Sequence, residues 1–186
     1  MALYNQFSNM PYIPYRILEY LAENNEVIWK LLKYQTVDAL SNPNLTLSEK
    51  MALIWNGDSN QEDYSVFFQR LIENAILDAK TILKIYKVFS VPVDHIRANV
   101  SYEFDIMYGS KLAVVRYNGV LCNRGDVFET EMLKTINGCY VGGIGMLQFN
   151  KKKSSYDMSS YNLGDSKSFD GISFIMTTQI GDVKNE

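Results

Sequence analysis

Apolar residues recur at helical spacing through the first third of the chain. In YRILEYLAENN, Ile17, Leu18 and Leu21 fall on one side of a helix, and NEVIWKLLKY repeats the same pattern. Pro14 suits the first turn of a helix, because its fixed φ is already helical and that turn needs no N–H donor. We therefore expect two successive helices in this region.

Start and stop signals set the boundaries of these helices. Asn24 and Asn25 interrupt or cap the first helix. After the turn cluster SNPN (41–44), Thr46 and Glu49 form a capping box, and we expect that helix to run through MALIW as far as NGD (56–58). Residues 59–80 leave two alternatives open: one amphipathic helix, or a short helix followed by irregular chain.

From residue 81 the pattern changes to that of strands. TILKIYKVF is rich in β-branched and aromatic residues, and VPVD indicates a turn. ANVSYEFDIMY then alternates apolar with polar positions, which predicts a strand with one buried face. The apolar set is Val100, Tyr102, Phe104 and Ile106, and the polar set is Ser101, Glu103 and Asp105.

The remaining elements complete an α+β fold. Short apolar pieces flank an Asn-Gly turn, and DVFETEMLKTING predicts a helix capped by Asp126 and ended by Asn137-Gly138. CYVGGIGMLQF reads as a strand, 150–170 as a polar loop and GISFIMTTQI as the last strand. We predict one domain over 1–186, with a helical N-terminal third (1–80) followed by a mainly antiparallel sheet that carries one helix (81–180).

The glycines of GCYVGGIGML do not form a phosphate-binding loop. No Lys-Ser or Lys-Thr pair follows them, and the segment comes after a helix instead of before one. The alternative is a helix stop at Gly138, followed by glycines that let a strand bulge or approach another backbone closely.

Composition bounds the class of protein. With 47% hydrophobic residues and a net charge of −3, the chain is globular and lacks the basic character of a dedicated nucleic-acid binder. No apolar run reaches the roughly 20 residues of a membrane span, and no signal peptide is evident. We expect a soluble protein without a membrane partner, in which Cys122 and Cys139 are reduced thiols unless the fold brings them together.

Candidate chemistry is sparse, whereas 13 Tyr and 9 Phe residues favour protein contacts. Glu103 and Asp105 share one strand face and could hold a divalent ion, with His95 nearby, as in a small metal-dependent nuclease or hydrolase. The plainer interpretation is a polar row on a strand. We expect no enzymatic activity, and no catalytic, cofactor-binding or metal-binding residue.

The second half of the chain resembles the tail-terminator, or tail-completion, proteins of the head–tail junction (neck) of tailed bacteriophages. The resemblance rests on the order of SYEFDIMY, NRGDVFETEMLKTING, GGIGMLQF and FDGISFIMTTQI. Its matching positions are Arg124, Asp126, Phe128 and Leu133 in the helix, and Phe169, Gly171 and Phe174 in the last strand.

This resemblance implies a structural virion protein, assembled in the bacterial host cytoplasm, that needs no cofactor. Such proteins form a ring, here a hexamer or dodecamer, between the tail tube protein and the head connector or stopper protein, and DNA only passes through the channel. A head-completion, stopper or connector-adaptor role is the alternative, and a monomeric binding module is a further one. The expected interface residues are Val100, Tyr102, Phe104, Arg124, Asp126, Lys134, Lys151, Lys152 and Lys153, although Arg124 and Asp126 could instead form an internal pair or cap.

Overall fold

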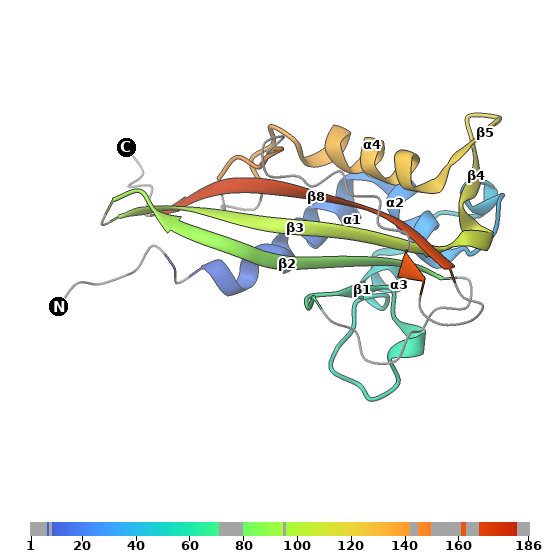
Figure 1. Ribbon diagram of the computed structural model, residues 1–186, viewed down its shortest axis with the longest axis horizontal. Coiled ribbons are helices and arrows are strands. Elements are labelled where there is room, and N and C mark those ends of the chain that lie inside the picture. Colours follow the sequence, from blue (N-terminus) through green and yellow to red (C-terminus); the bar gives the residue numbers. More distant parts are fainter. Residues whose placement is uncertain are drawn as a thin grey trace.

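The computed structural model describes residues 7, 9–70, 80–94, 96–141, 145–149, 161–162 and 168–181. Its longest helices are α1 (Ile13–Asn24), α2 (Glu26–Lys33) and α4 (Arg124–Ile136). These helices pack on one face of a sheet whose three long strands run side by side along the long axis of the molecule (Figure 1). The predicted α+β class, with helices first and a mainly antiparallel sheet carrying one helix, is confirmed.

Two sheets are formed by the strands β1 (Val66–Phe67), β2 (Thr81–Pro92), β3 (Arg97–Gly109), β4 (Val114–Tyr117), β5 (Val120–Asn123), β6 (Gln148–Phe149), β7 (Tyr161–Asn162) and β8 (Ser168–Gly181). The main sheet has the order β1-β2-β3-β8-β6, and β7 also pairs with β8. All its pairings are antiparallel except β1 with β2. β4 and β5 form a separate hairpin.

Asn25 separates α1 from α2, as its sequence position predicted. Its extended backbone ends α1, and its side-chain oxygen accepts a hydrogen bond from the backbone N–H of Ile28 at 3.0 Å. A short polar side chain can satisfy one of the N–H groups that a helix start leaves without a partner. The chain therefore turns sharply without leaving that donor unpaired.

The capping box at Thr46 is confirmed, but the helix that follows it is short. Glu49 accepts from the Thr46 N–H at 2.8 Å and donates its own N–H to the Thr46 hydroxyl. α3 (Leu47–Met51) ends before the predicted extension through MALIW, because Ile54 instead bridges to Val66 beside the sheet. Tertiary packing of this apolar segment outweighs its helical propensity.

The ambiguous stretch 59–80 adopts neither predicted form where it is described. A 3₁₀ turn (Gln61–Asp63) leads into β1, and residues 71–79 lie outside the described part. Further 3₁₀ turns cover Met10–Tyr12, Ala39–Ser41 and Ser110–Leu112.

The predicted Asn-Gly turn joins β4 to β5, with positive φ at both Asn118 and Gly119. Two positive φ values are what a type I′ hairpin turn requires, and Asn-Gly supplies them at the least steric cost. Gly138 also has a positive φ just after α4, which confirms the predicted helix stop.

The segment after α4 is not the continuous strand that its apolar character predicts. Tyr140 bridges only to Met146, and regular pairing begins at β6. The predicted close backbone approach is confirmed at Gly145, where an added Cβ would collide with the carbonyl oxygen of Gln179 and where φ is +86°. Gly145 thus allows this turn to lie directly against β8. The last strand, β8, is longer than predicted.

One hydrophobic core fills the space between the helices and the sheet. It includes Ile17 of α1, Trp29 of α2 and Phe128 of α4, all fully buried. From the sheet, Phe104 and Phe174 stack with ring centroids 5.3 Å apart. Because both halves of the chain contribute to it, the helical third and the sheet stabilise each other.

Candidate functional site

The helix-facing side of β3 is part of the core and does not form a surface. Val100, Tyr102 and Phe104 are 0–1% exposed, and the Tyr102 hydroxyl donates a hydrogen bond to the carbonyl of Met10 at 3.0 Å. The sequence placed these three side chains at an interface between subunits. Their single buried face is real, but the N-terminal helices of the same chain cover it.

The opposite face of β3 is polar and its charges are paired. The ammonium of Lys84 lies 2.6 Å from a carboxylate oxygen of Asp105, and Glu103 accepts a hydrogen bond from the Ser173 hydroxyl at 2.6 Å. Burial raises the pKa of Tyr86 well above its usual value, and the nearby charges of Asp105 and Glu103 raise it further. Each acid of the proposed metal pair thus has a neighbour from an adjacent strand.

These acids do not gather into a metal-binding cluster. No group of three or more His, Cys, Asp or Glu side chains that could hold a metal ion occurs among the described residues. His95 lies outside these residues, as do Lys151, Lys152 and Lys153. Cys122 and Cys139 are free thiols, both half-buried.

Arg124 has the internal role that the sequence left open, with carbonyls as its main partners. Its guanidinium donates to the backbone carbonyls of Leu112 at 2.8 Å, Leu31 at 3.0 Å and Thr36 at 2.6 Å, and to the Thr81 hydroxyl at 3.3 Å. The side chain is fully buried, and burial lowers the pKa of Arg124 to about 10. It stays charged at neutral pH and ties the end of α2 to the chain before β4.

Asp126 is exposed in the first turn of α4 and does not cap it. The N-cap is Asn123, whose side-chain oxygen accepts from the N–H groups of Gly125 and Asp126 at 2.8 and 3.2 Å. Asn123 also accepts from the Tyr108 hydroxyl at 3.1 Å. The sequence missed this cap because Asn123 also lies in the last position of β5 and so reads as part of the hairpin.

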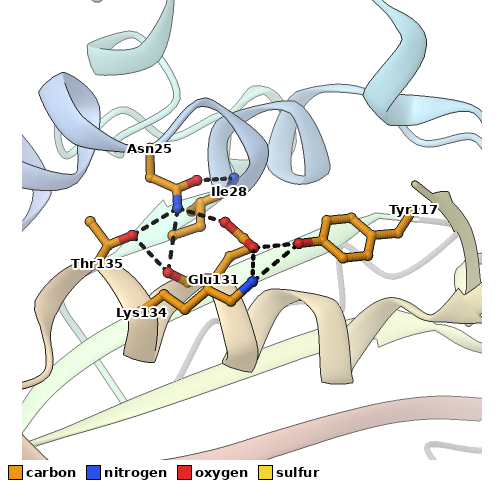
Figure 2. A network of polar contacts seen from close by, with 6 residues as sticks. All are labelled: Asn25, Ile28, Tyr117, Glu131, Lys134 and Thr135. Atoms are coloured by element: carbon orange, nitrogen blue, oxygen red, sulfur yellow. Dashed lines mark hydrogen bonds and ion pairs between the residues drawn. The ribbon is translucent and has the colours of Figure 1, made fainter.

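Lys134 belongs to a polar cluster that joins α4 to the start of α2 and to β4 (Figure 2). The carboxylate of Glu131 accepts from the Tyr117 hydroxyl at 2.6 Å, from Lys134 at 3.0 Å and from Asn25 at 3.1 Å. Asn25 also donates to the Thr135 hydroxyl at 2.8 Å. The cluster holds elements together, and the exposed ammonium of Lys134 remains at its rim.

Hydrogen bonding governs the protonation of this cluster. Burial alone would raise the pKa of Glu131, but the hydrogen bonds from Tyr117, Lys134 and Asn25 together lower it. The hydrogen bond that Lys134 donates to Glu131 raises the pKa of Lys134, and its hydrogen bond to Tyr117 raises that pKa further. The pair is therefore fully charged at neutral pH, which suits a structural ion pair.

Exposed apolar side chains gather at the two ends of the molecule. We call Val91, Val93 and Ile96, around the turn between β2 and β3, the arm tip; each is more than 40% exposed. The β4–β5 hairpin lies at the opposite end (Figure 1). We call its outer surface the hairpin patch, which consists of Val37, Asp38, Val114, Arg116 and Leu121.

An apolar cavity of about 300 Å³ lies where the start of α1 meets β2. We call it the α1–β2 pocket; its walls are Met10, Pro11, Pro14, Tyr15, Phe68, Ile85, Tyr86, Lys87 and Tyr102. The ammonium of Lys87 approaches only the sulfur of Met10, at 3.9 Å, and has no carboxylate partner among the described residues. The sequence carried no local signal for this pocket, because its walls come from four separate segments.

None of the helices in the described part of the chain is long and apolar enough to cross a membrane. No curated protein and no solved structure matches the chain. Residues 25–178, which span α2 to β8, match the YomW family, a phage-associated family named from a Bacillus prophage protein. The matched range covers most of the chain, including the buried arginine and the hairpin, and the chain therefore belongs to the phage-associated YomW family.

Proposed function

We propose that this protein is a structural virion protein of a tailed bacteriophage that acts at the head–tail junction as a tail terminator. Copies of the chain form a closed ring that caps the tail tube and joins it to the connector. The phage association of the family and the resemblance of the second half of the chain to tail-terminator proteins support this role.

The observation that carries the proposal is the presence of two different apolar surfaces, the hairpin patch and the α1–β2 pocket, in separate parts of one elongated molecule. A ring of identical subunits needs a heterologous contact, in which one surface of each subunit meets a different surface of the next. The β4–β5 hairpin and the β2–β3 turn lie at opposite ends of the molecule (Figure 1). The α1–β2 pocket is lined by residues of the start of α1, of β2 and β3 and by Phe68, none of which belongs to the hairpin patch. Exposed apolar groups of this kind mark interaction sites in soluble proteins.

The paired charges of the polar sheet face further favour assembly over chemistry. Lys84 pairs with Asp105, and the Ser173 hydroxyl donates to Glu103, so each of these acids already has a partner within the described part of the sheet. Within the ring, we assign the arm tip to the axial contact with the tail tube protein. It extends beyond the helices and leaves the hairpin end free for neighbouring subunits.

Light scattering of the purified protein, combined with negative-stain imaging, tests the ring. We expect a closed species of about six or twelve subunits, alone or after addition of the purified tail tube protein. Binding of that ring to tube ends, with tubes of defined length, identifies a terminator. Binding to the head connector alone would instead identify a stopper or adaptor. A chain that stays monomeric in the presence of both partners would contradict the proposal.

A further inference from the structure

The α1–β2 pocket has the properties of a site that receives another polypeptide. Its volume of about 300 Å³ is twice that of the roughly 150 Å³ cavity that a deleted core leucine side chain leaves, so it can accept two aliphatic side chains. Tyr15 and Phe68 in its walls are 45% and 39% exposed, which is unusual for aromatic rings at the rim of a core. The pocket thus leaves apolar surface uncovered.

Two charged side chains near the pocket have no ion-pair partner within the described part of the chain. Lys87 has no carboxylate partner in the described part of the chain, and the exposed Glu19 lies four residues after Tyr15, on the same face of α1. A cation thus lines the pocket and a carboxylate lies one helical turn along α1 from its wall, neither with an ion-pair partner among the described residues. The occupant that fits best presents exposed apolar side chains together with one carboxylate, which can pair with Lys87, and one cation, which can pair with Glu19.

The hairpin patch matches this description. On its outer face Val114 and Leu121 are 46% and 57% exposed, and the strand register places Leu121 directly opposite Arg116. Arg116 in turn pairs with Asp38 at 3.0 Å, and both side chains are about half exposed. An ion pair this exposed contributes little where it stands, so its two charges are available to new partners.

We propose that the hairpin patch of one copy inserts into the α1–β2 pocket of the next copy. Val114 and Leu121 fill the pocket, Lys87 pairs with Asp38 of the neighbour, and Glu19 pairs with its Arg116. This inference rests on the proposed ring and specifies its subunit contact. The two surfaces differ, so the contact is heterologous and repeats around a ring, which leaves neither surface exposed once the ring closes.

Two single variants and their mixture test the contact. Tyr15→Asp puts a carboxylate in the pocket wall and, being in the first turn of α1, is compatible with the helix. Leu121→Asp puts a charge on the hairpin patch. Each variant alone should remain monomeric by light scattering, whereas an equimolar mixture should form dimers, because the intact pocket of one variant accepts the intact hairpin of the other.

Leu47→Asp is the matched control, since Leu47 is 56% exposed and lies outside both surfaces. It should assemble like the wild type. A charge exchange sharpens the test: Lys87→Glu should weaken self-association by about tenfold or more, and adding Asp38→Lys in the same chain should restore it.

The outcomes separate the two proposals. Rings that persist in Tyr15→Asp or Leu121→Asp would overturn the pocket contact and leave the ring intact. Monomers in the mixture, with rings in the wild type, would also overturn it. A wild-type chain that stays monomeric up to its solubility limit, with and without the tail tube protein, would overturn both.

Discussion

The two faces of β3 follow the same alternating pattern but are stabilised in different ways. Its helix-facing side buries Val100, Tyr102 and Phe104 beneath helices that come from the first third of the chain. Its other side satisfies Glu103 and Asp105 through hydrogen bonds and ion pairs with the adjacent strands. The difference shows that an alternating strand predicts which side chains leave water but does not reveal whether the same chain or another subunit covers them.

The largest effect should come from the helix-facing side. Phe104→Ala removes a fully buried ring that stacks on Phe174, and we expect it to lower the free energy of unfolding by about 3–5 kcal/mol. Glu103→Ala, at the adjacent position on the polar face, removes the hydrogen bond from Ser173. We expect it to lower the free energy of unfolding by only about 1 kcal/mol. Urea denaturation of both variants measures the contrast. Equal losses would show that the two faces are equivalent.

The buried arginine comes next. Arg124→Met keeps much of the volume but leaves the carbonyls of Leu112, Leu31 and Thr36 without their donor, and we expect a loss of about 3 kcal/mol. Arg124→Lys should recover only part of this, because one ammonium cannot reach all of these acceptors in the geometry of a guanidinium. Thermal unfolding of the two variants and of the wild type measures the order of their stabilities. A fully stable lysine variant would mean that charge, and not the planar donor set, is what the site requires.

The ion pair of the polar face should have an intermediate effect. Asp105→Asn leaves the ammonium of Lys84, which is largely buried, without its carboxylate, and we expect a loss of about 2 kcal/mol. The double variant Lys84→Met with Asp105→Asn should be more stable than the single one, because it removes the unpaired charge as well. The denaturation midpoints of the single and the double variant show which of the two is more stable. A double variant that is less stable than the single one would contradict this account.

The smallest effect should come from the cluster on α4, and it should depend on pH. The pKa of Glu131 is lower in the folded protein than its unfolded value of about 4.3, so its contribution is fully present above that pH and is lost as pH falls through the folded pKa. Glu131→Gln should therefore cost less than about 1 kcal/mol at pH 7, and less at pH 3 than at pH 7. Stability curves at the two pH values test this, with Lys134→Gln as the companion variant. A stability loss for Glu131→Gln that is larger at pH 3 than at pH 7 would contradict the proposed pH dependence.

How far each feature could be predicted depended on how local its cause is. The capping box at Thr46, the end of the first helix at Asn24 and Asn25 and the Asn118-Gly119 turn each depend on contacts within a few residues, and all three were predicted. The extension of α3 through MALIW and the continuous strand after Gly138 were wrong, because Ile54 and Gly145 take their positions from contacts with Val66 and Gln179. Propensity within the segment does not contain that information.

The candidate surfaces were harder to predict than the fold. Arg124 was singled out correctly as a special residue, but its acceptor Leu31 lies 93 positions earlier and could not be inferred from spacing. The α1–β2 pocket and the hairpin patch were missed altogether. Their residues are ordinary aromatic and aliphatic side chains, and only the meeting of distant segments makes them a cavity and an exposed patch.

By itself, the sequence determined the order of the long helices and strands, the inward-facing side of β3 and several of the points at which elements begin or end. These features depend on periodicity and on hydrogen bonds between near neighbours. Only the tertiary structure decided that the N-terminal helices cover the sheet, that Arg124 is buried among carbonyls and that apolar surface remains at two opposite ends. The physical reason is that burial is a property of the whole packed chain, since the same side chain leaves water or stays in it according to which distant segment lies against it.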